Sequence, residues 1–197
     1  MNKLPDYEKA TNAAYDILIT YNEFSFPICI FSVIKQMKNI SLHRYTELAE
    51  RMNVSFYDLI NNIAPSCYGF TVFNEANDRY IIFYNNLKDD TTIRFTLAHE
   101  LGHVVLKHKK DGKTENKEAN CFARNYLCPV PVVKEMSLCC VSDYTELFYV
   151  SEPMAKVSMD FKNCDLRNIS TNYFTAYNNS VMFAMSGISP IDLYGYY

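Results

Sequence analysis

The stretch that decides the fold is Arg94-Phe95-Thr96-Leu97-Ala98-His99-Glu100-Leu101-Gly102-His103. On an α-helix, His99 and His103 project from one face about one turn apart, because they are four residues apart. Both imidazoles can then meet one zinc ion at roughly 2.0–2.1 Å. Glu100 lies about 100° around the helix, so it suits a catalytic base better than a third ligand. The stretch therefore indicates a centre for one Zn²⁺, with His99 and His103 as metal ligands and Glu100 as the base.

The residues around the motif predict a buried helix over residues 93–107, because they are apolar almost all round it. Buried polar side chains need partners, and a metal ion supplies them for His99, Glu100 and His103. Gly102 is a poor helix former, which indicates close approach by another element. The alternative is a pair of core histidines satisfied by hydrogen bonds alone.

A catalytic zinc needs a third protein ligand, and the next helix, predicted over residues 115–127, offers Glu115 and Glu118. The apolar stripe of this helix consists of Ala119, Phe122, Ala123, Tyr126 and Leu127. Glu115 falls within that stripe by angle, and Glu118 lies at its margin, so periodicity permits either as a ligand. Both also fit an ordinary role in the first turn, where the helix dipole favours acidic residues.

The motif stretch, with Glu118-Ala119-Asn120-Cys121-Phe122-Ala123 and Leu127-Cys128-Pro129 downstream, resembles the ImmA/IrrE family of metallopeptidases over residues 45–160. The resemblance implies that the glutamate before Ala-Asn is the third zinc ligand, and so it selects Glu118. It also implies an α+β, gluzincin-like fold, in which helices pack on a small antiparallel sheet and the motif lies on a buried helix. Some relatives carry an extra glutamate two residues before the ligand, where this chain has Asn116.

His108 stands where relatives of this family often carry histidine, five residues beyond His103. One interpretation is a contact with substrate or with the oxyanion. The other is a solvated histidine near the end of the helix, where the dipole favours a cation.

The rest of the chain predicts one domain over residues 1–197, with a core at 45–160 and a C-terminal extension at 163–197. Helical spacing predicts helices at 6–19, 28–37, 143–148 and 152–161, and a hairpin is predicted from 69–73 and 79–84. Two short helices within 45–63 resemble a helix-turn-helix unit. The second has no Arg or Lys, which favours a structural role over DNA reading. The extension is rich in Asn, Ser and Tyr, has turn signals at Gly187, Pro190 and Gly195, and shows no strong period.

Composition narrows the possible partners and the compartment. The formal net charge of -3 gives no strong field to attract nucleic acid. Seven cysteines, an odd number without a signal peptide, favour reduced thiols in a cytoplasm. We find no apolar run near the roughly 20 residues of a membrane span. The expected partner is therefore a protein, with no direct nucleic acid and no membrane.

The resemblance also implies a function, since members of this family are commonly encoded on phages and mobile elements. There they relieve repression by cutting a partner repressor. We therefore expect a zinc endopeptidase specific for a helix-turn-helix repressor. The alternative is an antirepressor that binds the repressor through a zinc-stabilised fold without cutting it. The two functions differ at Glu100, which a protein that only binds does not need.

Overall fold

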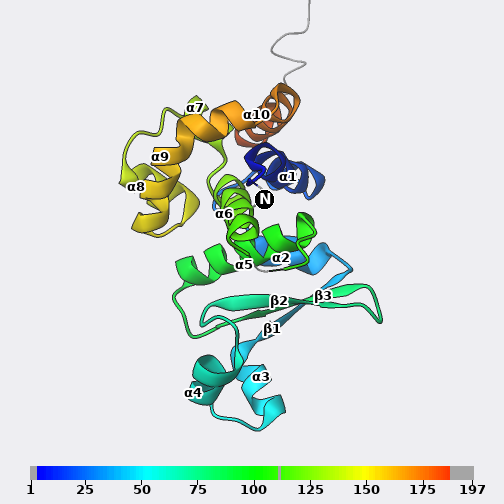
Figure 1. Cartoon of the computed structure of the whole chain (residues 1–197). Helices are drawn as coiled ribbons and strands as arrows, with labels where there is room; N and C mark the ends of the chain where they lie inside the picture. Colours follow the sequence, from blue (N-terminus) through cyan, green and yellow to red (C-terminus); the bar gives the residue numbers. More distant parts are fainter. Residues whose placement is uncertain (1–3, 111, 187–197) are drawn as a thin grey trace, which may run out of the picture.

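The computed structural model describes residues 4–110 and 112–186, with helices on both sides of a small sheet (Figure 1). The strands are β1 (Ile40–Arg44), β2 (Gly69–Asn74) and β3 (Arg79–Tyr84). The helices are α1 (Tyr7–Thr20), α2 (Ile30–Gln36), α3 (Tyr45–Met52), α4 (Phe56–Asp58) with a π-helical turn η1 (Leu59–Ile63), α5 (Asp90–Val105), α6 (Lys113–Leu127), α7 (Val130–Glu135), α8 (Val141–Phe148), α9 (Glu152–Asn168) and α10 (Thr171–Ser186).

The sheet is mixed, so the expectation of a purely antiparallel sheet is wrong. Its order is β1-β3-β2, with β1 parallel and β2 antiparallel to β3. The β2–β3 hairpin is where the sequence predicts it. The unexpected strand β1 has only Ile40 buried, so its apolar pattern is weak, and its pairing depends on a partner 40 residues away. Among the described residues β2 is an edge strand.

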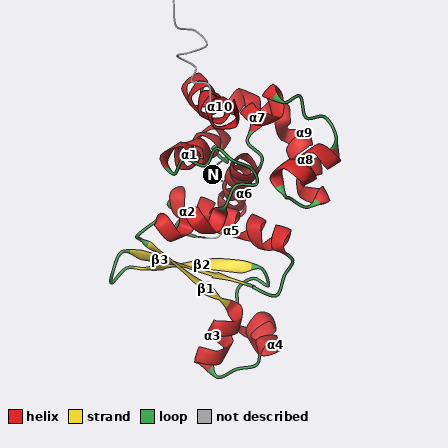
Figure 2. Cartoon of the chain, turned by 180° about the vertical axis from the view of Figure 1, so that it is seen from behind, coloured by secondary structure: helices red, strands yellow, loops and turns green. Residues whose placement is uncertain are grey.

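The alternation of side chains in the hairpin separates two packing faces. Thr71 and Ile82 are paired across the strands and face α5. Phe70 and Phe83 face the other way and stack with ring centroids 5.0 Å apart. They pack against the small core of α3, α4 and η1 around Tyr45. Both views place this helix-turn-helix-like unit across the sheet from α5 (Figures 1 and 2).

Above the sheet, α5, α6 and α1 form successive layers, and α7 to α10 pack around them (Figure 1). One hydrophobic cluster runs through these layers from Ala10 in α1 to Val181 in α10. It therefore extends on both sides of the 45–160 core that the resemblance covers. Within residues 4–110 and 112–186, no helix is both long and apolar enough to cross a membrane.

The chain beyond residue 163 is more regular than its composition suggests. Helix α9 continues to Asn168, and α10 covers Thr171–Ser186. Tyr177 and Val181, four residues apart, are the buried residues of α10, so its apolar stripe is narrow and hard to detect by periodicity. Gly187, Pro190 and Gly195, which carry the predicted turns, lie outside the described residues.

Candidate metal centre

Helix α5 carries the motif and begins at a well-formed cap. The carboxylate of Asp89 accepts hydrogen bonds from the backbone N–H of Thr92 (2.9 Å) and from the hydroxyls of Thr91 and Thr92 (2.7 Å each). The hydrogen bonds from Thr91 and Thr92 hold the pKa of the Asp89 carboxyl well below its ordinary value. This cap fixes the start of the helix three turns before the motif.

The two motif histidines converge as their spacing predicts. Their Nε2 atoms lie 3.1 Å apart, and their ring centroids 4.8 Å apart. Both are half-buried on the side of α5 that faces α6. Gly102 lies between them, where an added Cβ would lie 3.1 Å from Phe122 Cδ1 and 3.2 Å from the Cα of Ala119. The expected close approach is therefore confirmed, and the approaching element is α6.

Helix α6 turns two asparagines toward these imidazoles. Asn116 Oδ1 lies 3.2 Å from Nε2 of His99 and 3.2 Å from Nε2 of His103. Asn120, one turn later, places its Oδ1 2.8 Å from His99 Nδ1. Since an amide oxygen can only accept, His99 Nδ1 donates this hydrogen bond. In that tautomer of neutral His99, the lone pair is on Nε2, the atom that lies next to His103 Nε2 and Asn116 Oδ1.

Glu118 does not lie with the motif histidines. Its Oε1 accepts a hydrogen bond from the backbone N–H of Asp6 (2.8 Å), and its Oε2 lies 2.9 Å from His108 Nε2. The physical reason is helical geometry. Glu118 is two residues and therefore about 200° from Asn116 around α6, so both cannot face the same imidazoles. The resemblance selected Glu118, whereas the structure brings Asn116 to the histidine pair.

His108 is enclosed rather than solvated, and it packs on the motif. Lys107 adopts φ 56° just after α5, which turns the chain back so that the His108 N–H donates to the His103 carbonyl (3.0 Å). The Nδ1 atoms of His108 and His103 lie 3.1 Å apart. A carboxylate accepts, so His108 Nε2 donates to Glu118. In the tautomer in which His108 Nδ1 accepts from His103 Nδ1, the lone pair of His103 lies on Nε2.

Glu100 lies on the side of α5 next to the sheet. It is buried, at 8% exposure, and its Oε2 accepts a hydrogen bond of 2.7 Å from the hydroxyl of Thr71 on β2. The first residue of β2, Gly69, allows this approach, because an added Cβ would lie 2.6 Å from Thr96 Cγ2 of α5. The edge strand and the motif helix are therefore in direct contact at Glu100.

A cavity of about 630 Å³ opens beside these residues. His99, Glu100 and Asn116 line it, whereas His103, His108 and Glu118 do not. Its other walls come from the segment leading into β2, from the first half of α5, from α6 and from the start of α9. The apolar residues of those walls include Tyr68, Phe95, Met154 and Val157.

The donor atoms fit a tetrahedral ion. His99 Nε2, His103 Nε2 and Asn116 Oδ1 form a triangle with sides of 3.1, 3.2 and 3.2 Å. Ligands at about 2.0–2.1 Å in a tetrahedron are about 3.3–3.4 Å apart, so this triangle approximates one of its faces. Among the described residues, no group of three His, Cys, Asp or Glu side chains is arranged to hold a metal ion.

A comparison with known protein families matches residues 65–147 to the Peptidase M78 family, described as the IrrE N-terminal-like domain. The match begins just before β2 and ends in α8, so it includes the motif helix and α6. This match, which covers less than half of the chain, supports an assignment to the ImmA/IrrE family. The resemblance to ImmA/IrrE proteins is thereby confirmed, and the domain is of a peptidase type. A search of curated proteins finds no match to the chain.

In this IrrE-like domain, sequence reasoning located the histidine pair and Glu100 but missed three side chains around them. The sequence marks Asn116 only as a departure from relatives, and it gives no prediction for Asn120 or Thr71. The four-residue spacing of Asn116 and Asn120, which matches that of His99 and His103, was the available signal.

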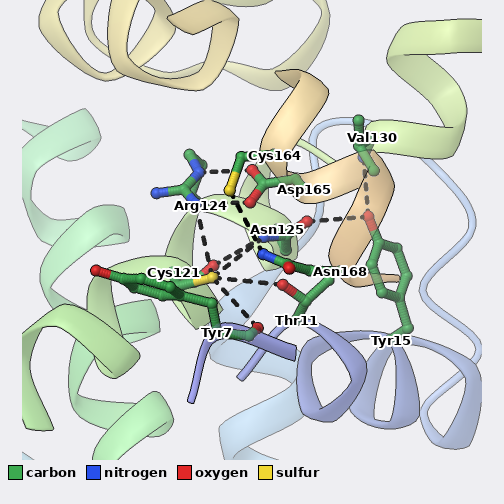
Figure 3. Close-up of polar contacts among 10 residues, drawn as sticks. All are labelled: Tyr7, Thr11, Tyr15, Cys121, Arg124, Asn125, Val130, Cys164, Asp165 and Asn168. Atoms are coloured by element: carbon green, nitrogen blue, oxygen red, sulfur yellow. Dashed lines mark hydrogen bonds and ion pairs between the residues drawn. The ribbon is translucent and has the colours of Figure 1, made fainter. Parts of the chain in front are cut away.

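A polar network connects α6 to α1 and α9 (Figure 3). Arg124 makes a bidentate ion pair with Asp165 of α9, with both N···O distances 2.7 Å. Cys121 Sγ lies 3.4 Å from the hydroxyl of Thr11 and 3.8 Å from the Tyr7 carbonyl on α1. Burial raises the pKa of the Cys121 thiol to about 11, so it stays protonated and can donate to that carbonyl. The network holds the helix that carries Asn116 against α1 and α9.

Proposed function

We propose that this IrrE-like protein is a zinc-dependent endopeptidase that hydrolyses one specific protein substrate. The observation that carries the proposal is the position of Glu100. Its carboxylate lines the same cavity as His99 and is in contact with an edge strand. A carboxylate that shares a cavity with a metal-binding imidazole can act as the base in metal-assisted hydrolysis.

His99 and His103 would hold the ion through their Nε2 atoms, because their Nδ1 atoms are engaged by Asn120 and His108. When bound, zinc supplies a Lewis acid that polarises water and the substrate carbonyl. Glu100 accepts a proton from the attacking water and returns it to the leaving amine. Thr71 holds the Glu100 carboxylate in place for both transfers through its 2.7 Å hydrogen bond.

The substrate would bind as an extended strand along β2. An edge strand has backbone donors and acceptors available for a further strand, and pairing there gives affinity without sequence specificity. A strand on this edge passes the cavity mouth, where Met154 and Val157 of α9 offer apolar contacts to its side chains. The geometry suits a single unfolded segment of a partner protein.

We propose a helix-turn-helix repressor of a phage or mobile element as that partner, on the strength of the family resemblance. The helix-turn-helix-like unit of this protein is poorly suited to bind DNA. It packs on the sheet through Tyr45 and Leu59, and residues 56–63 contain no Arg or Lys. We also propose a cytoplasmic location, which is supported by the seven cysteines, all in the described part of the chain and all free thiols.

One observation favours the alternative, a non-catalytic antirepressor. The oxygen at the third corner of the donor triangle belongs to the Asn116 amide, which is a weaker zinc ligand than a carboxylate. A metal held less tightly would serve a binding fold as well as an enzyme. Glu100 has no evident task in such a protein.

The test is incubation of the zinc-loaded protein with candidate repressors, followed by intact-mass analysis of the products. Glu100→Gln should keep the fold and the metal while the cleavage rate falls about 10²–10⁴-fold, because the amide cannot accept the proton. Glu146→Gln, an exposed carboxylate on α8, is the matched control and should cleave at the wild-type rate. Cleavage by Glu100→Gln at the wild-type rate would refute this mechanism. Tight repressor binding without cleavage by the wild type would establish the antirepressor.

A further inference from the structure

The family resemblance selects Glu118 as the third metal ligand, but in the structure Asn116 contacts the histidine pair and Glu118 contacts His108. We propose that Asn116 supplies the third protein donor of the metal centre, and that Glu118 is a positioning residue that acts through His108 on His103. This proposal rests on the metal centre of the proposed function and names the residues that build it.

The case for Asn116 is the convergence of three electron-rich atoms. The hydrogen bond from His99 Nδ1 to Asn120 places the His99 lone pair on Nε2. The Nε2 atoms of both histidines and the Oδ1 of Asn116 then lie within 3.2 Å of one another. Three donor atoms this close together can coordinate one cation. Because Asn116 also lines the cavity, an ion held there is accessible to substrate.

The case for Glu118 as a positioning residue is a continuous chain of contacts. Its carboxylate accepts from His108 Nε2 at 2.9 Å, and His108 Nδ1 lies 3.1 Å from His103 Nδ1. The side chains of Glu118 and His108 are both almost fully buried, with exposures of 6% and 7%. A carboxylate behind a ligating histidine fixes the tautomer and ring orientation of that histidine. Here the Glu118 carboxylate acts indirectly, because the His108 imidazole lies between it and His103.

The backbone also holds Glu118 away from the ion. The N–H of Asp6, at the N-terminal cap of α1, donates to Glu118 Oε1 at 2.8 Å. Both carboxylate oxygens therefore have protein partners, Asp6 and His108, and neither partner is His99 or His103. Glu118 projects from α6 in a direction nearly opposite to that of Asn116, so its carboxylate could approach the histidine pair only by giving up both contacts.

The experiment compares Co²⁺ and Zn²⁺ binding in the full-length protein, Asn116→Asp, Asn116→Ala and Glu118→Gln. Zinc affinity is measured by chelator competition, and the visible absorption of bound Co²⁺ reports the directly coordinating atoms. Asn116→Asp keeps the shape and adds a negative charge, so it should bind zinc at least about tenfold more tightly and shift the Co²⁺ bands. Asn116→Ala should weaken binding and also change the bands.

Glu118→Gln should weaken zinc binding about 10–100-fold, as loss of an outer-layer partner does, while the Co²⁺ bands stay in place. A control for its mechanism is the double variant Glu118→Gln/His108→Gln, whose loss should not exceed that of His108→Gln alone. Circular dichroism checks that each variant folds. If Glu118→Gln fails to fold, Asn116→Asp still tests the third ligand, because this substitution hardly changes the side-chain volume.

The measurements distinguish failure of this inference from failure of the proposed metal centre. If Glu118→Gln changes the Co²⁺ bands and Asn116→Asp leaves them and the affinity unchanged, Glu118 is the ligand and this inference is overturned. If the wild-type protein binds neither ion, or binds them equally well in His99→Ala, the metal centre of the proposed function is itself wrong.

Discussion

The hydroxyl of Thr71 donates a 2.7 Å hydrogen bond to Oε2 of Glu100 and so joins the edge strand β2 to the motif helix α5. The same strand offers the free edge on which we propose that substrate binds. In the proposed mechanism, Thr71 therefore connects the substrate-binding strand to the catalytic base. A substitution at Thr71 tests the positioning of Glu100 separately from metal binding.

Thr71→Val should lower kcat about tenfold with little change in zinc content. The variant removes a hydrogen bond to a charged group, worth about 1.5 kcal/mol or more, while its shape fits the same space. Thr71→Ser keeps the hydroxyl and should restore most of the rate. Equal kcat values for wild type and Thr71→Val on a cleaved repressor would show that Thr71 does not position Glu100.

Gly102→Val should loosen the metal centre by separating α5 from α6. An added Cβ would already lie 3.1 Å from Phe122 Cδ1 and 3.2 Å from the Cα of Ala119, and the second contact is with backbone. Overpacking of this kind costs about 1–3 kcal/mol. We expect lower stability in urea and weaker zinc binding together, because Asn116 moves away with α6. Wild-type zinc affinity in a destabilised Gly102→Val protein would mean that α6 contributes no donor.

Arg124→Met should destabilise the fold by about 3–5 kcal/mol, because it leaves the carboxylate of Asp165 buried without its partner. Arg124→Met combined with Asp165→Leu should recover much of this loss, since the double variant leaves no unpaired charge. Chemical unfolding of the two single variants and the double variant measures the coupling. Additive losses would show that the ion pair does not join α6 to α9.

Asp89→Ala should reduce stability by an amount that depends on pH. Hydrogen bonds in the folded state hold the pKa of the Asp89 carboxyl below its ordinary value. The stabilisation is therefore fully present above the unfolded pKa of about 3.9 and is lost as the pH falls through the lower, folded value. The difference in melting temperature between wild type and Asp89→Ala should be constant near neutrality and shrink below about pH 4. Asp89→Asn, which retains a cap, is the control. A difference that grows on acidification would contradict this account.

The sequence was informative wherever function depends on local spacing. The four-residue interval of His99 and His103 predicted their convergence, and the poor helix propensity of Gly102 predicted a close neighbour. The same reasoning could not choose a third donor, because Glu115, Asn116 and Glu118 lie on one helix whose rotation about its axis depends on tertiary contacts. The cap contact from Asp6, 112 residues away, helps to set that rotation.

Features that depend on distant partners were also missed. Strand β1 forms because Ile40–Arg44 pairs in parallel with β3, and the five residues alone carry little strand signal. Helix α10 forms where Tyr177 can enter the core, 5.5 Å from the ring of Tyr15 on α1. His108 is buried only because Lys107 takes a left-handed conformation that ends α5 and turns the chain back. No local period encodes these contacts.

The central claim is that the motif on α5 holds a metal ion, and elemental analysis of protein purified without chelator tests it most directly. We expect one divalent ion per chain, zinc where the cell supplies it, in the wild-type protein. We expect almost none in a folded His99→Ala/His103→Ala double variant, because two of the three donor atoms are gone. A stoichiometry that stays near one in that variant would contradict the account.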